Sequence, residues 1–479
     1  MFPLLLSLAS LAGPMPADDQ TAFCATGQPP EVHFLSEPRF PPPPDDGDKE
    51  IESWFEVGPS QEVSEHFVVH WGPQARFDAD QAGFILDALE QAWHTYTVEL
   101  GHPEPPDSDT LYVNVYVADS YAGAPAASTG TAYEARDPNR RSYLVFNAER
   151  LGDDPEWIRF VATHETYHAM QYAAGTWRDN YVYQWWIEAT AQSMSARALR
   201  DDTWAIDRLH SFAHYPHLSI NAYEEIDYDN PRSLHRYGAY LFVEELIAHS
   251  GEQTVVNTFT QEINDPLEYM RDELAWRGVD LDRVWFDTIT HTITMDFPRH
   301  GAYAEHMEAH ADLPDAALQV SFEVPSGGTS TMAWAPEATL PGAYGANIAH
   351  WADPDPGRYL VHIDLDDSGT KGTKGAGLML ELVTRSGDGP AVYTPLEVDG
   401  DEAHAFVEIP AAVDEAWIVI GVVGPRSNPL EPEVFAYTWW VESLPSPPAT
   451  SGGCSQTGGA GLGWMLGFLP LILLRRKKR

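Results

Sequence analysis

The spacing of hydrophobic and polar positions divides the chain into regions of different secondary structure. Between residues 64 and 150, strand-like runs at 67–71, 111–117 and 142–147 alternate with a helical stripe over residues 78–100. Helical spacing dominates from residue 155 to about residue 301. Beyond about residue 315, short β-rich runs are separated by Gly, Pro and Asp clusters. The pattern predicts an α+β domain over residues 64–312 and an all-β sandwich accessory domain over residues 315–442.

The two ends of the chain have the composition of processing segments. Residues 2–11 form a short apolar run followed by small residues, so residues 1–17 are predicted to be a secretory signal peptide. Residues 18–63 are a Pro- and acid-rich lead-in. At the other end, residues 443–457 form a linker that contains Cys454, and residues 458–479 form a short apolar transmembrane segment with five basic residues at its end.

This order of a cysteine motif, a short span and a basic end resembles the MYXO-CTERM class of bacterial sorting tails. The resemblance covers about 30 residues and implies sorting and processing machinery at the membrane as a partner. It also implies cleavage near Cys454 after a transient stay in the membrane. We therefore expect an exported protein at the cell surface or outside the cell.

The net charge of the chain limits the classes of molecule that it can bind. The chain has 28 Lys+Arg against 72 Asp+Glu, a formal net charge of −44, which argues against nucleic acid as a partner because phosphates need a basic face. The two cysteines, Cys24 and Cys454, are too few for a disulfide-rich scaffold or a cysteine-ligated zinc cluster. A metal site in this chain would therefore rest on ligands other than a cluster of cysteines.

A candidate for such a site is the motif His-Glu-Thr-Tyr-His at residues 164–168. Asp154 and Pro155 suit the start of a helix, and Gly175 suits its end. Spaced by four, the two histidines project from one helix face and can bind one metal ion. Glu165 lies about 100° round the helix, where it can act on a water molecule instead of the metal.

A third ligand is available 20 positions after His168. Glu188 lies in a second predicted helix that starts with Trp185-Trp186. Two neutral imidazoles and one carboxylate leave Zn²⁺ with a net charge of +1 and with a fourth position for water, as catalytic zinc requires. The cofactor predicted from the residues is therefore Zn²⁺, bound by His164, His168 and Glu188.

This pattern resembles that of the gluzincin zinc metallopeptidases. The sequence around it is similar to that of secreted bacterial metalloproteases with an E-A-T-A second motif. The resemblance covers roughly residues 64–300, with sharp motifs at residues 164–195. It implies a zincin-like catalytic domain, a protein or peptide substrate, and Glu165 as the general base. Thermolysin-like members carry an Asp four residues after the glutamate ligand, where this chain has Gln192. The group that orients a ligand histidine is thus left open.

The implied reaction is endopeptidase hydrolysis, in which a water activated by Zn²⁺ and Glu165 attacks a peptide carbonyl. The oxyanion needs a further donor, and gluzincins commonly use a Tyr or His from a later helix. Tyr237 is the first candidate for this catalytic role, and His235 is the second. The alternative function is a cell-surface binding or adhesive protein with a degenerate or structural zinc site, which four closed ligands would indicate.

Overall fold

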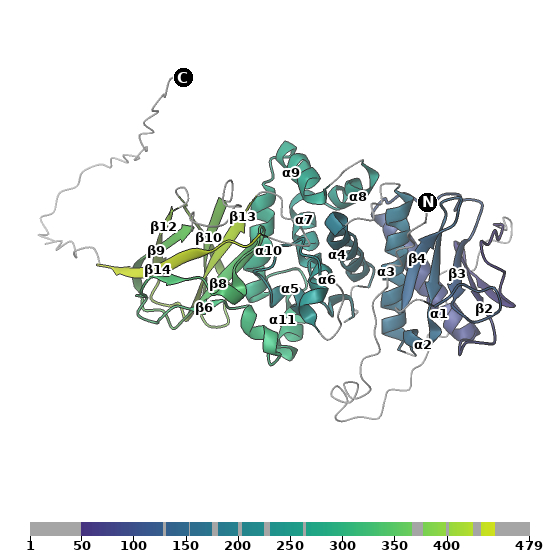
Figure 1. The fold of residues 1–479 in the computed structure, drawn as a ribbon, viewed down its shortest axis with the longest axis horizontal. Coiled ribbons are helices and arrows are strands. Elements are labelled where there is room, and N and C mark those ends of the chain that lie inside the picture. Colours follow the sequence, from purple (N-terminus) through teal and green to yellow (C-terminus); the bar gives the residue numbers. More distant parts are fainter. Residues whose placement is uncertain are drawn as a thin grey trace, which may run out of the picture. The chain divides into compact units, whose positions relative to one another are not determined.

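The computed structural model describes residues 49–127, 131–152, 154–174, 181–199, 204–224, 230–261, 265–365, 377–398, 402–424 and 433–445. As far as Leu444 these residues belong to one compact unit, which is mixed α/β with several sheets (Figure 1). The predicted signal peptide, most of the lead-in, both cysteines, Gly175 and the predicted sorting tail lie outside the described residues. None of the described helices is both long enough and apolar enough to cross a membrane.

The first sheet contains the strands that the alternating runs predict. Its order is β1-β2-β3-β5-β4, with β2, β3 and β5 parallel and both edge strands antiparallel. The strands are β1 (Ser60–Val63), β2 (Phe67–Trp71), β3 (Val113–Val117), β4 (Ala132–Arg136) and β5 (Ser142–Phe146). The predicted strands at 67–71, 111–117 and 142–147 are confirmed by β2, β3 and β5.

The two faces of this sheet are covered by different parts of the chain. Val113, Val115 and Val117 lie in the main core with the helices. On the opposite face, Tyr116 packs edge-on against Phe55, with ring centroids 5.2 Å apart. Residues 50–63, which the Pro-rich composition assigns to the lead-in, therefore pack on the sheet. Phe55 of this segment covers apolar surface that would otherwise face water.

Two helices pack against the first sheet and against each other. In α1 (Ala79–Trp93), Asp78 and Gln81 form a capping box, and the helix continues as a π-helix over His94–Glu99. In α3 (Pro155–Ala173), the Asp154 side chain accepts hydrogen bonds from the backbone of Glu156 and Trp157. The predicted helices and the predicted N-cap of α3 are confirmed.

Further helices lie before and after α3 in the chain. Those in the described residues are α2 (Ala148–Leu151), α4 (Tyr181–Ala198), α5 (His210–Ala213), α6 (His235–Gly238), α7 (Tyr240–Ser250), α8 (Gln253–Thr260), α9 (Pro266–Trp276), α10 (Leu281–Thr294) and α11 (His300–Ala309). Helix α4 begins at Tyr181, four residues before the Trp185 start that the sequence predicts. Tertiary contacts hold the N-terminal part of α4. The Tyr183 hydroxyl donates to the Thr258 carbonyl, and the Trp186 indole donates to the Thr258 hydroxyl.

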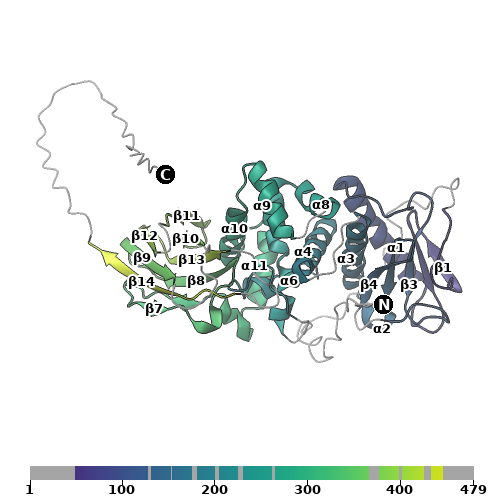
Figure 2. The ribbon, with the colours of Figure 1, turned by 45° about the horizontal axis from the view of Figure 1, so that its top comes forward.

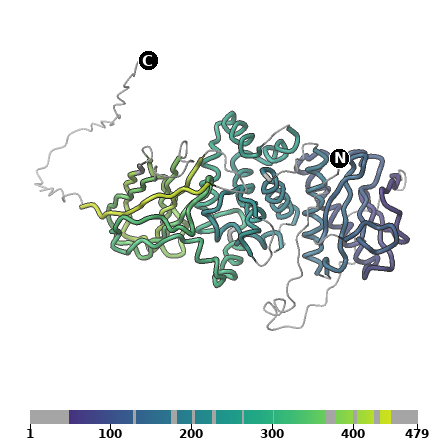
Figure 3. The backbone as a smooth tube through the Cα atoms, viewed as in Figure 1, coloured from purple at the N-terminus to yellow at the C-terminus, as the bar shows by residue number. Residues whose placement is uncertain are grey.

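The C-terminal region, coloured green to yellow in Figure 3, forms two mainly antiparallel sheets. Their strand orders are β11-β10-β13-β8-β6 and β12-β9-β14-β7. Their strands are β6 (Phe322–Glu323), β7 (Ala333–Trp334), β8 (Gly345–Ala352), β9 (Gly357–Leu365), β10 (Gly377–Arg385), β11 (Val392–Leu396), β12 (Glu402–Ile409), β13 (Glu415–Val423) and β14 (Tyr437–Leu444). Strand β9 alternates buried and less buried residues, whereas β13 is buried along most of its length. Helix α10 explains the difference, because it contacts β10 and β13.

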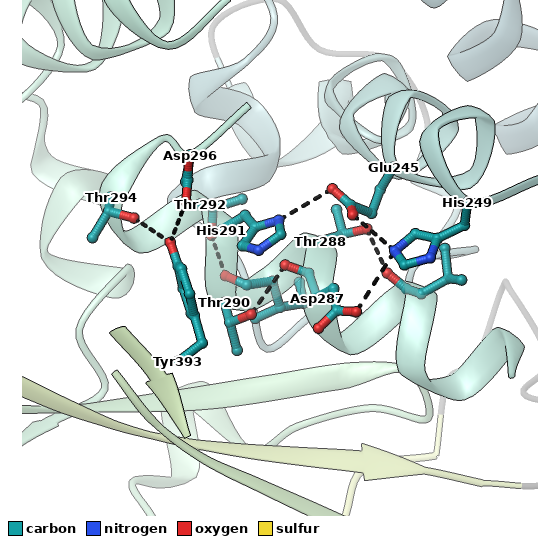
Figure 4. Close-up of polar contacts among 12 residues, drawn as sticks. Glu245, His249, Asp287, Thr288, Thr290, His291, Thr292, Thr294, Asp296 and Tyr393 are labelled. Carbon is teal, nitrogen blue, oxygen red and sulfur yellow. Dashed lines mark hydrogen bonds and ion pairs between the residues drawn. The ribbon is translucent and has the colours of Figure 1, made fainter. Parts of the chain in front are cut away.

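A polar network joins α7 to α10. Glu245 accepts from His249 through Oε1 and from His291 through Oε2, both at 3.1 Å (Figure 4). His249 also lies 3.7 Å from Asp287. Near the end of α10, the Tyr393 hydroxyl of β11 bonds to Thr294 at 2.7 Å. These contacts connect the helices to a strand of the C-terminal sheets.

Candidate metal centre

The predicted ligands come from two neighbouring helices. Helix α3 carries His164, Glu165 and His168, and α4 carries Glu188. The two helices contact each other, and α3 also contacts the edge strand β4 (Figure 2). All four side chains are buried, with exposures between 4% and 8%. The site is therefore built on rigid elements with little access for bulk water.

The three ligand atoms form a nearly equilateral triangle. The His164 Nε2 atom lies 3.1 Å from His168 Nε2 and 3.3 Å from Glu188 Oε2, and the third side is 3.5 Å. Tetrahedral zinc with ligands at about 2.0–2.1 Å requires separations of roughly 3.3 Å. The donor set and its spacing thus fit a zinc ion without rearrangement of the backbone.

The tautomer of His168 is fixed by Gln171, one turn further along α3. His168 Nδ1 donates to Gln171 Oε1 at 2.8 Å, so Nε2 keeps its lone pair for a metal. The Gln171 amide is in turn oriented by α4, because its Nε2 donates to the Ile187 carbonyl at 3.0 Å and to Thr190 Oγ1 at 2.8 Å. Gln171 supplies the orienting contact that the sequence left open.

Gln192 does not take that role in the contacts that the described residues make. Its side chain is buried and donates to the Ala205 carbonyl at 2.8 Å. This bond ties α4 to the short 3₁₀ helix Trp204–Ile206. The position occupied by Asp in thermolysin-like enzymes is therefore used here to hold α4 to a neighbouring segment.

A further carboxylate faces the site from the edge strand β4. Glu134, Glu165 and His168 each offer a ligand atom within 4.8 Å of the others. Glu134 Oε1 also accepts from the Tyr172 hydroxyl at 3.2 Å. Burial raises the pKa of Glu165 well above its ordinary value, and the neighbouring Glu134 carboxylate raises it further.

The site as a whole has an excess of acidic groups. Burial alone would lower the pKa of His168, but Glu134, Glu188 and Glu165 outweigh burial and raise it to about 10. The carboxylates therefore attract positive charge to the point where the imidazole nitrogens converge. A divalent cation is the charge that such a buried, acid-rich cluster favours.

The two candidate oxyanion donors are in different environments. The Tyr237 ring on α6 lies beside His164, with ring centroids 6.3 Å apart, and it is buried. His235 instead stacks on Phe212 at 4.9 Å, and its Nδ1 lies 3.3 Å from the Ser211 carbonyl. Burial lowers the pKa of His235 to about 3. Of the two, only Tyr237 contacts a predicted ligand in the described residues.

The structure brings His164, His168 and Glu188 together as predicted, and it adds two neighbours, Gln171 and Glu134, that the sequence did not point out. Gln171 had a signal, since it lies three positions after His168 and faces the same side of α3. No local sequence pattern points to Glu134, because its place beside Glu165 depends on how β4 pairs with β5 and contacts α3. Chemically, the cluster can hold a divalent cation and can keep a carboxylate and a phenol next to it.

Comparisons with known proteins show which family the chain belongs to. No curated protein matches the chain. Among solved structures, a family GH115 4-O-methyl-alpha-glucuronidase, BtGH115A, with specificity for decorated arabinogalactans, aligns at 11% identity and a TM-score of 0.14. That alignment covers 60% of this chain and 39% of the enzyme, and at this TM-score it carries no argument about fold or function. Residues 45–429 match DUF6055, described as a family of unknown function. Because this match covers most of the 479 residues, the chain belongs to the DUF6055 family.

Proposed function

We propose that this protein is a zinc-dependent endopeptidase with a zincin-like catalytic domain. The observation that carries the proposal is the triangle of His164 Nε2, His168 Nε2 and Glu188 Oε2, with sides of 3.1, 3.3 and 3.5 Å. Two imidazoles and one carboxylate are a catalytic zinc set that leaves one position open. A carboxylate one residue after the first ligand is the general base that such a set requires.

The edge strand β4 supports a peptide as the substrate. It ends the first sheet on the side that contacts α3, so its outer edge lies next to the metal ligands. A sheet edge binds an extended peptide through main-chain hydrogen bonds. A peptide bound along β4 would bring a carbonyl group to the open position of the site.

Each residue then has a defined part in hydrolysis. A bound zinc ion would act as a Lewis acid that polarises the peptide carbonyl and makes water more acidic. Glu165 takes a proton from the attacking water and passes it to the leaving amine. Tyr237 donates a hydrogen bond to the carbonyl oxygen as negative charge develops on it. Gln171 keeps His168 in the tautomer that binds metal.

A surface binding protein with a structural zinc site is the alternative. Structural zinc is normally closed by four ligands. Among the described residues, His164, His168 and Glu188 form one group of three possible ligands, whereas Glu134 and Glu165 form a separate group with His168. A set of three ligands favours an open, catalytic site.

Hydrolysis and metal content measured on the same preparation test the proposal. We expect one zinc ion in the catalytic site, cleavage of casein or of a broad peptide library, loss of cleavage after chelation, and recovery after zinc is restored. Zinc bound at this site without cleavage of any peptide in the library would favour the binding protein.

We further propose that the protein is exported and that sorting machinery removes its tail near Cys454. The support is the apolar start, the linker and the basic end of the sequence, all outside the described residues. Mass spectrometry of the native protein should show loss of roughly the last 25 residues. An intact chain that ends in Arg479 would contradict this processing.

A further inference from the structure

We propose that His210, His306 and His310 form a second binding site for a divalent transition metal, separate from the site on α3 and α4. The three histidines each offer a nitrogen within 4.8 Å of the others. Imidazole is a preferred ligand of zinc, copper and nickel. The site would join α5, which begins at His210, to α11, which carries His306 and precedes His310 (Figure 1).

The distance between the first two nitrogens is that of two ligands on one metal. His210 Nδ1 lies 3.1 Å from His306 Nε2. Tetrahedral zinc with imidazole ligands places such nitrogens roughly 3.3 Å apart. His306 and His310 are four positions apart on one helical face, the spacing at which two imidazoles reach the same ion.

The third histidine is held in the metal-binding tautomer. His310 Nδ1 donates to the His306 carbonyl at 2.8 Å, which leaves the lone pair on Nε2. A backbone carbonyl that accepts from the second ring nitrogen is the usual support of a ligating histidine.

The rings must turn to bind one ion. The His310 ring stacks on His210 with centroids 4.3 Å apart and on His306 with centroids 4.1 Å apart. Because a metal lies in the plane of each ligating ring, binding would turn His310 out of both stacks by rotation about its side-chain bonds, and this rotation would lengthen its hydrogen bond to the His306 carbonyl. His306 and His310 are only half-buried, so the solvent-facing side of the cluster permits such a rotation and the entry of the ion.

A positive side chain lies near the cluster. Arg208 pairs with Asp207 at 2.8 Å, so its charge is balanced by a neighbouring carboxylate.

A metal at this second site would stabilise the helix that presents Tyr237. Phe212 of α5 stacks on His235 at the start of α6. The backbone of Gly238 in α6 approaches α5 so closely that a Cβ would lie 2.6 Å from the Cβ of Phe212. Fastening α5 to α11 would therefore also restrain α6.

Zinc stoichiometry of histidine variants tests the second site. The full chain without a polyhistidine tag is stripped with a chelator, dialysed against buffered Zn²⁺ alone and analysed for zinc. The key sample is the double variant H164Q/H168Q, in which the site on α3 is removed. We expect it to keep one equivalent of zinc, and we expect the quadruple variant H164Q/H168Q/H306Q/H310Q to keep none. The control H164Q/H168Q/H94Q, which removes an exposed histidine outside the cluster, should still keep one equivalent.

The outcomes separate this site from the proposed catalytic one. If H164Q/H168Q binds no zinc, or if the quadruple variant still binds one equivalent, the second site does not exist. If the wild type binds one equivalent that only H306Q/H310Q removes, the second site stands and the proposed catalytic zinc fails. Should the quadruple variant not fold, X-ray absorption of zinc-loaded H164Q/H168Q should show three imidazole ligands. A spectrum with one imidazole or none would overturn the site.

Discussion

One amide, that of Gln171, connects the two helices of the candidate metal centre and orients one of its predicted ligands. Its oxygen accepts from His168, and its nitrogen donates to two acceptors on α4. The two hydrogen bonds from the amide nitrogen determine that the amide oxygen faces His168. The His168 ring is therefore held with its Nε2 atom towards the site. Neighbours of this kind typically change metal affinity by about 10–100-fold when they are removed.

We therefore predict that Gln171→Leu weakens zinc binding by about 10–100-fold, because His168 Nδ1 loses its acceptor. Gln171→Glu should restore part of the affinity, since a carboxylate also accepts from Nδ1. The matched control is Gln192→Leu, which removes another buried amide of α4 that bonds to the Ala205 carbonyl and not to a ligand. Competition titration with a zinc chelator gives the affinities. Equal affinity in Q171L and the wild type would refute the orienting role.

The success and failure of sequence reasoning at this site have a simple physical origin. His164 and His168 are set four apart by helix geometry, and Glu188 needs only an adjacent helix, so their convergence follows from local structure. Glu134 reaches Glu165 from a strand whose position is fixed by tertiary packing. Gln171 lies one turn from His168 on the same helix, but the resemblance to thermolysin-like enzymes points only to position 192 and leaves the orienting group open.

At the scale of elements, the network between α7 and α10 makes their packing depend on pH. Burial alone would lower the pKa of His291, but the hydrogen bond and charge of Glu245, together with Asp287 and Asp296, outweigh burial and raise it. A histidine whose pKa is raised on folding stabilises the fold in its protonated form. This contribution is complete below the ordinary value of 6.5 and is lost as the pH rises through the raised pKa.

We predict that His291→Gln lowers the free energy of unfolding by about 1–2 kcal/mol at pH 6, where the charged hydrogen bond to Glu245 is present. The difference from the wild type should shrink towards pH 9, as the wild-type histidine loses its proton. Glu245→Gln should show the same pH dependence, and the double variant should lose little more than either single variant. Urea unfolding at both pH values measures this. A difference that grows with pH would contradict the assigned interaction.

Element positions were largely predictable because local signals mark them. Asp154 and Pro155 begin α3, and alternating valines mark β3, before any tertiary contact is considered. The first turn of α4 was missed because Tyr183 and Trp186 are held by Thr258, 72 and more positions away. Similarly, β1 is recruited from a Pro-rich segment by pairing with β2.

At the scale of the whole molecule, α10 joins the helices to the C-terminal sheets by close packing. Gly421 of β13 faces α10, and a Cβ at that position would lie 2.6 Å from the Phe286 ring and 2.9 Å from Trp285. Both rings are fully buried, so neither can move freely. The junction accounts for the burial of β13 and for the single compact unit that these residues form.

We predict that Gly421→Ala lowers the stability of the protein by about 1–3 kcal/mol, because the methyl group overpacks this junction. The control is Gly83→Ala on α1, where no atom lies within 4 Å of the new Cβ. Alanine there should be neutral or should stabilise by up to about 1 kcal/mol, owing to its higher helix propensity. Calorimetry gives both Tm values. An unchanged Tm for G421A would show that the junction is loosely packed.

The most direct test of a catalytic zinc site is the variant Glu165→Gln, which removes the proposed base and leaves the ligand triangle intact. We predict that Glu165→Gln binds zinc with the same stoichiometry as the wild type. Its kcat/KM for peptide hydrolysis should fall by roughly 10²–10⁴-fold, the usual contribution of a general base. Metal analysis and hydrolysis assays on the same samples measure both quantities. Near-full hydrolysis by the zinc-loaded variant, or loss of its zinc, would contradict the account.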